Sequence, residues 1–397
     1  MTESSTRLNI EILGISPYNK GALLMLEAIR QKFREQLPQA RLAVPSSWPT
    51  DQRLELGLYC TYLRERSGLD KSRLMELLPR GFRQSVGFMS PNDVDVVLDA
   101  SGFAYGDYWG LQKLQGRLGR TAGQWKTERK TLVLLPQAFG PFESPGMAEA
   151  LRAALRKADL VFARDPLSLQ HVQGVLGQVP HDTVRLSPDF TPLLKAELPA
   201  RLEHVRGAVL IIPNEKMVAG DRAPLRDDYL AFLRCCAESL AGMGREVMVL
   251  VHEGAQDRRL ARELNASLAR PLAVIDEPSP VVTKAVIGAA HAVVSSRFHG
   301  LVSALSAAVP TLACGWTHKY QALMTDYGCP EFNIDMADRA SWPDKLALLE
   351  RAAQDDAVRG QLQAAVARQR SLGEAMWASV FELLRHRHPA QTAAVQP

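Results

Sequence analysis

Residues 292–311 read AVVSSRFHGLVSALSAAVPT. Ala292 to Val294 predict the end of a buried parallel strand, and the spacing of Leu301 and Leu305 predicts a helix over residues 301–308. The polar hexapeptide between them, residues 295–300, is then expected at the carboxyl end of a strand and the opening turn of a helix. An open α/β sheet usually binds its ligand at such a place, so this stretch predicts both the fold class and the site.

The hexapeptide SSRFHG carries residue types that suit an anionic substrate and acid/base chemistry. Free backbone N–H groups and the positive end of a helix dipole favour an anion beside Ser295 and Ser296. Arg297 can grip a carboxylate or phosphate in two places, and His299 can exchange a proton near neutral pH. The alternative is that Arg297 and His299 only cap the helix or lie solvated on the surface.

Strands and helices alternate on both sides of this stretch. Before and after it we expect strands at 208–212, 246–251, 273–275 and 311–313, with helices at 229–242, 256–268 and 281–289. Further towards the N-terminus we expect strands at 9–14, 41–44, 94–100, 131–135 and 160–163, with helices at 22–37, 59–66, 72–78, 147–157 and 166–175. Regular alternation predicts an α/β protein with two similar halves, each with a parallel sheet.

The irregular, proline-bearing segment 186–206 separates the two series of strands. We therefore expect an N-terminal domain over residues 1–190 and a C-terminal domain over residues 207–343. The alanine-rich, charged tail 344–388 is expected to form helices that pack back across both domains, and residues 389–397 are expected to be disordered.

Composition excludes several functions. The formal net charge of +4 is mild and spread along the chain, which fits an anionic small molecule or an anionic lipid surface but does not indicate nucleic acid. The five cysteines lack metal-ligand spacing, so we expect reduced thiols, no metal and a cytoplasmic location. The N-terminus shows no signal peptide, and no apolar run is long enough to span a bilayer.

Residues 293–328 resemble the C-terminal signature of the polysaccharide pyruvyl transferases. In that family a Ser-Arg-x-His turn is followed by an Ala/Ser-rich helix, a Val-Pro or Gly-Pro step, and an aromatic residue with a lysine shortly after. Weaker matches occur, in the family's order, at Asn19 with Gly21, Ser101-Gly102, Pro136-Gln137 with Gly140-Pro141, Arg164-Asp165 with Ser168, and Pro188-Asp189.

The resemblance implies two Rossmann-like domains facing a central cleft, as in the GT-B glycosyltransferases, with the acceptor on the N-terminal side and the donor on the C-terminal side. It also implies transfer of the pyruvyl group of phosphoenolpyruvate onto two hydroxyls of a sugar, giving a cyclic ketal. The acceptor would be a sugar, an oligosaccharide or a lipid-linked glycan for a cell-surface polysaccharide, made at or near the inner face of the membrane. No cofactor is expected besides the donor substrate.

The resemblance also suggests roles for individual residues. Arg297 would hold the donor phosphate or carboxylate, His299 would act as acid or base, and Arg164 would reach the donor from the other domain. The remaining candidates are Ser295, Ser296, His318 and Lys319 for the donor, and Asn19, Lys20, Gln137 and Asp189 for the acceptor or the domain boundary. His252 and Asp276 also follow predicted strands, although turn or cap roles are the more usual ones there.

Two other functions are compatible with the sequence. One is a nucleotide-sugar glycosyltransferase of the same two-domain type, although a Gly-rich diphosphate turn would be expected where Ser295-Ser296 stands. The other is a non-catalytic partner in glycan assembly that keeps the fold.

Overall fold

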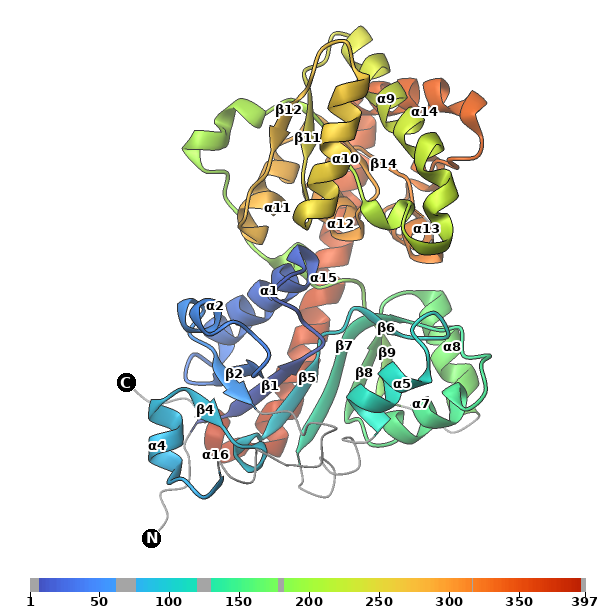
Figure 1. Cartoon of the computed structure of the whole chain (residues 1–397). Coiled ribbons are helices and arrows are strands. Elements are labelled where there is room, and N and C mark those ends of the chain that lie inside the picture. The colour runs from blue at the N-terminus through green and yellow to red at the C-terminus, as the bar shows by residue number, and fades with distance from the viewer. Residues whose placement is uncertain (1–6, 62–75, 120–129, 178–181, 316, 394–397) are drawn as a thin grey trace. The chain divides into compact units, whose positions relative to one another are not determined.

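The computed structural model describes residues 7–61, 76–119, 130–177, 182–315 and 317–393 of the chain. The chain forms two compact units (Figure 1). The first contains Met1–Pro17, Met25–Phe190 and Leu372–Pro397, and the second contains Tyr18–Leu24 and Thr191–Ser371. The expected N-terminal domain over residues 1–190 therefore differs from the first unit at residues 18–24, which belong to the second.

The first unit is organised around a parallel sheet. In spatial order its strands are β4 (Phe88–Met89), β3 (Tyr59–Thr61), β2 (Arg41–Pro45), β1 (Asn9–Leu13), β5 (Val96–Asp99), β7 (Thr131–Phe139), β8 (Leu160–Ala163) and β9 (Val184–Leu186), with β6 (Phe103–Tyr105) paired to β7. The apolar runs of β5 and β8 are fully buried, because helices cover both faces of the sheet. Strand order reverses between β1 and β5, which creates a switch point at their carboxyl ends.

The helices in the described part of the first unit, some of them a single turn, mostly connect these strands. They are α2 (Thr50–Glu55), α4 (Arg80–Ser85), α5 (Leu111–Leu114), α7 (Met147–Leu155), α8 (Pro166–Leu176) and α16 (Pro389–Thr392), together with most of α1 (Lys20–Gln36). Proline stands in the first turn of α8, and Asp165 caps that helix by accepting a hydrogen bond from the backbone N–H of Ser168 (2.7 Å).

The second unit has a five-stranded parallel sheet. Its spatial order is β12 (Ala273–Ile275), β11 (Val247–Leu250), β10 (Val209–Ile212), β13 (Ala292–Ser295) and β14 (Thr311–Ala313). Its helices are α9 (Arg226–Gly242), α10 (Gly254–Ser267), α11 (Pro280–Gly288), α12 (Phe298–Leu305), α13 (His318–Asp326) and α14 (Trp342–Gln354). The order reverses between β10 and β13, so this unit is doubly wound with its own switch point.

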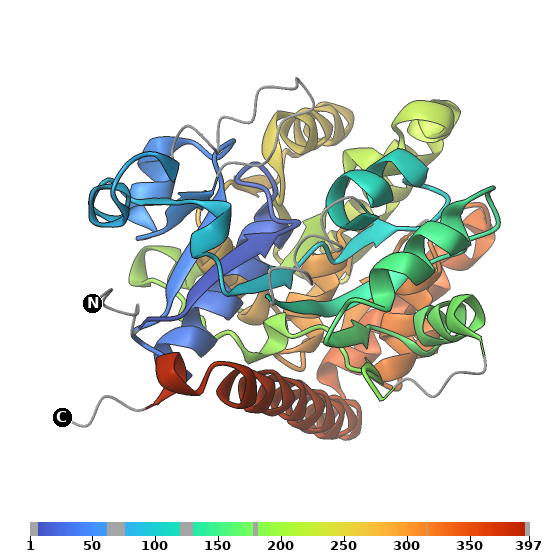
Figure 2. The same cartoon turned by 90° about the horizontal axis from the view of Figure 1, so that it is seen from below.

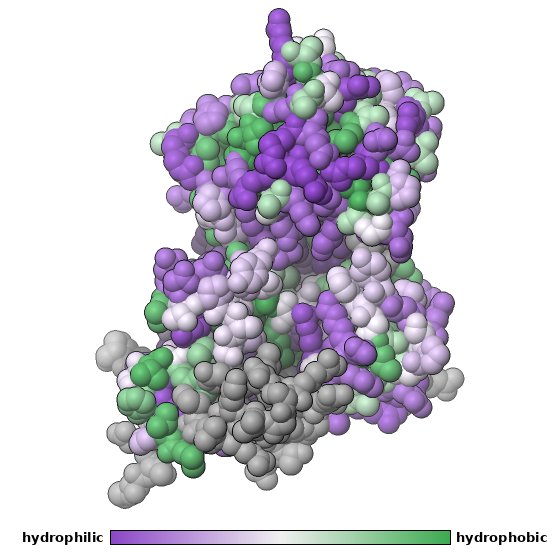
Figure 3. All heavy atoms as spheres, in the orientation of Figure 1, coloured by the Kyte–Doolittle hydropathy of each residue, from purple (hydrophilic) through white to green (hydrophobic). Residues whose placement is uncertain are grey.

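Alternate residues of β10 enter two different cores, as the period of two in a strand requires. Val209 and Ile211 pack with Phe232 of α9, whereas Leu210 and Ile212 pack with Val286 of α11. Both faces of the sheet are therefore covered by helices, so the sheet itself can contact a ligand only at its strand ends and their loops. On the outer side, Figure 3 shows hydrophilic side chains gathered over α10.

The long helix α15 (Asp356–Arg387) belongs to both units, with residues 356–371 in the second and residues 372–387 in the first. Its C-terminal half runs along the first unit (Figure 2). There Trp377 is 1% exposed and meets the rings of Phe33, Phe190 and Phe381, with centroids 6.2, 5.7 and 5.7 Å away. Lys32 of α1 adds an ion pair with Glu374 (2.6 Å).

Three local predictions were wrong. Tyr59–Thr61 forms strand β3 and not a helix, because these residues pair with β2 and β4; residues 62–66 lie outside the described part, as does most of 72–78. Strand β7 continues to Phe139, so Gln137 is a strand residue and not a turn residue. Within the tail expected to be disordered, Pro389–Thr392 forms α16, where Thr392 is buried and donates to the carbonyl of His388 (2.8 Å).

Candidate functional site

The hexapeptide 295–300 lies at the switch point of the second unit, after β13, as predicted. Ser295 Oγ accepts a hydrogen bond from the backbone N–H of Arg297 (3.0 Å), which closes the turn. The carbonyl of Ser296 accepts from Asn214 Nδ2 (2.8 Å) and from Tyr320 Oη (3.0 Å), so residues after β10 and β14 hold the turn from two sides. Arg297 is the N-cap residue of α12, whose first N–H groups have no partner within the helix.

Arg297 is 9% exposed and its guanidinium is paired with two carboxylates. Nε and Nη2 donate to the two oxygens of Asp257 (3.0 and 2.6 Å), and Nη1 donates to Glu253. Burial acts to lower the pKa of Arg297, but Asp257 and Glu253 outweigh it, so the pKa is raised. These three hydrogen bonds leave two of the five N–H groups of the guanidinium for another acceptor.

Asp257, which is fully buried on α10, does more than pair with Arg297. Its carboxylate also accepts from the backbone N–H groups of Glu215 (3.1 Å) and Glu253 (3.0 Å), which fixes the loops after β10 and β11. Burial raises the pKa of Asp257, and Arg297 acts in the opposite direction. Removing Arg297 would therefore leave a buried carboxylate without its counter-charge.

His299 occupies the first turn of α12 and is half-buried as a residue, with its Nε2 shielded from solvent. Gly21 lies directly against its imidazole, because a Cβ added at Gly21 would be 2.3 Å from His299 Nδ1. A contact below 3.0 Å forces a neighbour to move, so glycine is required at position 21 for this close approach. Gly300 is constrained in the same way, because a Cβ added to it would be 2.7 Å from Ser295 Oγ.

The Asn19-Lys20-Gly21 turn is attached to the second unit by two hydrogen bonds. Asn19 Nδ2 donates to Glu253 Oε1 (2.6 Å), and Lys20 Nζ donates to the carbonyl of Val251 (3.1 Å). Asn19 Oδ1 also accepts from the N–H of Ala22 (2.8 Å), which caps the start of α1. The structure therefore brings Asn19 and Lys20 together with Arg297 and His299, whereas the sequence suggested that they stand on the acceptor side or at the domain boundary.

His252, which directly follows β11, is buried beside these groups, and its Nδ1 has no hydrogen-bond partner among the described residues. Its pKa lies well below the usual 6.5, first because of burial and then because of the charges of Arg297, Lys20 and His299. His252 is therefore neutral at pH 7. Asp276, by contrast, pairs with the exposed Arg258.

Lys319, in the first turn of α13, has its ammonium 5.2 Å from the centre of the Phe298 ring and 5.5 Å from that of Tyr320. These distances allow cation–π contacts. Lys319 is thus held next to the first residue of α12. The side chain of His318 lies outside the described part of the structure.

The other candidates belong to the first unit, at the carboxyl ends of its strands. Arg164, after β8, is 6% exposed and its Nη1 is 3.7 Å from Asp189 Oδ2. Gln137 on β7 pairs in register with Ala163, and both atoms of its buried amide have no hydrogen-bond partner among the described residues. Arg164, Gln137 and Asp189 therefore form a polar group within the first unit.

Some polar side chains of both units were missed from the sequence. Glu253 and Asp257 are spaced by four, which places an acid at the N-cap of α10 and another in its first turn, and this spacing next to His252 was a usable signal. In the first unit, Ser101 Oγ accepts from Arg117 Nη1 (2.7 Å), and the ring of His171 lies 2.5 Å from the position of a Cβ on Gly140. No local pattern marks Arg117 or His171, because each comes from a distant helix.

Two further observations concern the described residues as a whole. No group of three or more His, Cys, Asp or Glu side chains among them is placed to hold a metal ion. None of the helices in the described part is both long and apolar enough to cross a bilayer.

Comparison with known proteins agrees with the fold and gives the family of the chain. The model of a family described as polysaccharide pyruvyl transferase matches residues 19–318. The match begins at Asn19 and ends at His318, so it includes both the Asn-Lys-Gly turn and the Ser-Arg-x-His turn.

Solved structures similar to this chain share its fold at low sequence identity. A glycosyltransferase from Rickettsia africae is 11% identical with a TM-score of 0.58, and the alignment covers 97% of this chain and 99% of that one. A UDP-N-acetylglucosamine 2-epimerase is 12% identical with a TM-score of 0.58, covering 96% of each chain. A spinosyn rhamnosyltransferase is 14% identical with a TM-score of 0.53, covering 94% of this chain and 100% of that one. The predicted α/β class with two Rossmann-like domains of GT-B type is thus confirmed.

Proposed function

Because the chain belongs to the polysaccharide pyruvyl transferase family, whose model matches more than half of it, we propose that it transfers the pyruvyl group of phosphoenolpyruvate onto two hydroxyls of a sugar. Membership of this family makes the protein an enzyme and a transferase. The donor, the ketal product and the roles of the residues are our proposal. The acceptor we propose is a sugar within a cell-surface polysaccharide or its lipid-linked precursor.

The observation that supports this proposal best is the position of His299. It lies in the first turn of α12 at the switch point, half-buried, with Arg297 before it and the Asn19–Gly21 turn packed against its ring. A helix N-terminus favours an anion, and a histidine placed there can exchange a proton with it. One site thus combines anion binding with proton transfer.

In the proposed reaction, the methylene carbon of phosphoenolpyruvate gains a proton and becomes the methyl group. One sugar hydroxyl oxygen forms a bond to the adjacent carbon, and a second hydroxyl oxygen forms another as the bond from that carbon to the phosphate oxygen breaks. Phosphate leaves with the bonding electrons. Of the two hydroxyl protons, one replaces the proton given to the methylene carbon and the other leaves with phosphate or solvent.

We assign the proton at the methylene carbon to His299, because it is more accessible than His252 and because burial and neighbouring cations keep His252 neutral. A well-placed general acid of this kind contributes about 10²–10⁴-fold in rate. The backbone N–H groups of α12, the two remaining N–H groups of Arg297, and Lys319 would bind the phosphate and carboxylate of the donor. To Ser295 we assign the role of shaping the turn, since its hydroxyl is buried and accepts from the backbone N–H of Arg297.

We further propose that the polar group of the first unit, formed by Arg164, Gln137 and Asp189, binds the sugar acceptor. The amide of Gln137 is buried and has no hydrogen-bond partner in the described part of the chain, so it can bond a hydroxyl group through both its oxygen and its nitrogen. Replacing Gln137 by Leu should then raise KM for the acceptor and leave KM for phosphoenolpyruvate unchanged. Equal changes in the two constants would contradict this assignment.

The test of the proposed function is to incubate the protein with phosphoenolpyruvate and a panel of glycosides in D₂O. We expect phosphate release that depends on the glycoside, with an acid-labile mass gain on the sugar and one deuterium in the new methyl group. Transfer from nucleotide sugars without turnover of phosphoenolpyruvate would indicate a glycosyltransferase. If no donor reacts and the protein captures a glycan-assembly protein, its role is non-catalytic.

A further inference from the structure

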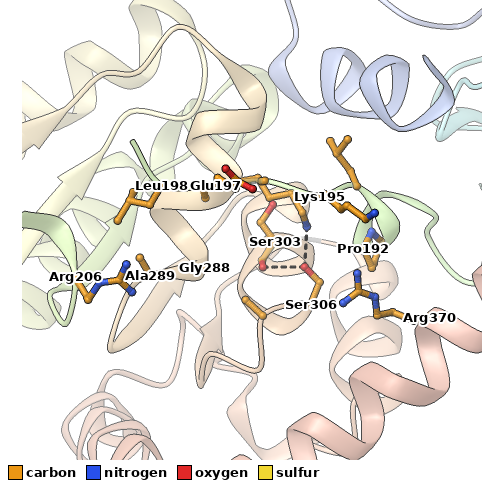
Figure 4. A pocket seen from close by; sticks show the side chains of 15 residues that line it. Pro192, Lys195, Glu197, Leu198, Arg206, Gly288, Ala289, Ser303, Ser306 and Arg370 are labelled. Atoms are coloured by element: carbon orange, nitrogen blue, oxygen red, sulfur yellow. Dashed lines mark hydrogen bonds between the residues drawn. The ribbon is translucent and has the colours of Figure 1, made fainter. Parts of the chain in front are cut away.

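A cavity of about 520 Å³ lies in the second unit, away from the carboxyl ends of the strands. Its walls come from the segment 192–198, from α11, from the C-terminal end of α12 and from α15 (Figure 4). The charged and hydroxyl side chains that line it include Lys195, Glu197, Arg206, Lys284, Ser306 and Arg370. A water molecule occupies about 30 Å³ of liquid, so the cavity has the volume of roughly 17 waters.

Lys284 is the buried cation of this cavity, with only 8% of its surface exposed. Its ammonium donates to Ser306 Oγ (2.8 Å), and that hydroxyl donates in turn to the carbonyl of Ser303 (2.9 Å), as the dashed lines in Figure 4 show. The hydroxyl of Ser306 is neutral, so this hydrogen bond orients the ammonium without cancelling its charge.

Positive charge exceeds negative charge around the cavity. Arg206 is paired with Glu203 and exposed, so it belongs to the outer rim. Lys195, Lys284 and Arg370 also line the cavity, whereas Glu197 is the single carboxylate among the described lining residues. Figure 4 shows the guanidinium of Arg370 directed from α15 towards Ser306. Charged groups from three separate segments thus converge on one side of the cavity.

The opposite wall is of a different kind. Ala285, Gly288 and Ala289 present small side chains or none, next to Leu198. Such a wall can pack against the uncharged part of a ligand, while the cationic side binds an anionic group. The volume exceeds what a bare phosphate would fill, so the two walls together suit a molecule that carries a phosphate and a compact polar body.

We propose that this cavity is a second ligand site, which binds a soluble sugar phosphate or a similar small phosphomonoester. Its phosphate contacts Lys195, Lys284 and Arg370. The site is distinct from the transferase site. Arg297 precedes α12 and Ser306 follows it, and nine residues at 1.5 Å each separate the two by about 13 Å along the axis. This inference does not depend on the proposed function.

A purely structural role for Lys284 is the alternative. The lysine could serve only to join α11 to α12 and to favour the negative C-terminal end of α12. That role explains the hydrogen bond between Lys284 and Ser306. It does not require a cationic side chain at the exposed positions of Lys195 and Arg370. Variants at these two exposed positions therefore separate ligand binding from packing.

The experiment is a thermal-shift titration of the full chain with glucose 6-phosphate, with glucose as the uncharged control. We expect the phosphate ester, and not glucose, to raise the melting temperature of the wild type in proportion to occupancy. The Lys195→Gln/Arg370→Gln double variant should bind about tenfold or more weakly, because it loses two charge-assisted hydrogen bonds. The matched control Arg206→Gln should keep the wild-type Kd within about twofold.

A His299→Ala variant locates the bound ligand. If the cavity binds the ester, this variant has the same Kd for glucose 6-phosphate as the wild type. Loss of the shift in His299→Ala would place the ligand at the transferase site and overturn the proposal. So would an equal weakening in Arg206→Gln, or no shift in the wild type beyond that seen with glucose.

Discussion

Asn19 Nδ2 donates a hydrogen bond of 2.6 Å to Glu253 Oε1, although 234 residues separate them in the chain. Glu253 also accepts from Arg297, so one carboxylate links the N-terminal turn to the Arg-x-His turn. The turn at residues 18–24 therefore belongs to the second unit, where it contacts the same carboxylate as the Arg-x-His turn.

The link through Glu253 can be tested at Asn19. Asn19→Asp keeps a good N-cap for α1 but places a second carboxylate next to Glu253. Asn19→Ser also keeps the cap, but its shorter side chain loses the hydrogen bond to Glu253. We expect Asn19→Asp to lower kcat/KM more than Asn19→Ser, with little difference in melting temperature. Equal activity in the two variants would show that the contact with Glu253 does not matter for catalysis.

Because Gly21 and His299 are in contact, we expect substitutions at the two positions to have non-additive effects on activity. In isolation Gly21→Ala should favour helix α1, by up to about 1 kcal/mol. In the protein the new methyl group would displace the imidazole, so we expect activity to fall at least tenfold.

A double-mutant cycle supplies the control for this pair. In a His299→Ala background, Gly21→Ala should cost little further activity, because there is no ring left to displace. Additive losses would mean that the methyl group acts through something other than His299.

Arg297 is expected to affect both stability and donor binding. Arg297→Met leaves Asp257 buried and without its counter-charge, which typically costs about 3–5 kcal/mol. Adding Asp257→Asn should recover part of the unfolding free energy but none of the activity. If the double variant regains turnover, the role of Arg297 is structural only.

His252 predicts a pH dependence of stability. Its pKa is lowered in the folded state, so below about pH 6.5 the unfolded chain binds a proton that the folded chain does not. The contribution of neutral His252 to the free energy of unfolding is thus fully present above pH 6.5. It decreases as the pH falls, by at most about 1.4 kcal/mol per pH unit.

Urea unfolding at pH 7.5 and 5.5 measures this contribution. His252→Gln removes the titrating group, so the variant should lose less unfolding free energy than the wild type between the two pH values. A wild type and a variant with identical pH dependence would contradict the assignment of a neutral, buried His252.

Much of the fold could be read from the sequence because strands such as β13 and β8 are continuous apolar runs between helices with clear spacing. β3 was misassigned because three residues carry too little periodicity, and its pairing with β2 and β4 determines its structure. Arg297 and His299 were recognisable as a local motif. Their contacts with Glu253, Asp257 and Gly21 were not, since these depend on how distant segments pack.

The most direct test of the account is phosphate release from phosphoenolpyruvate in the presence of an acceptor glycoside. The comparison is between the wild type, His299→Ala and the matched control His204→Ala, whose histidine is exposed in the same unit. We predict acceptor-dependent release by the wild type and His204→Ala, and a rate about 10²–10⁴-fold lower for His299→Ala. Release at the wild-type rate by His299→Ala would contradict the central claim that this site transfers the pyruvyl group.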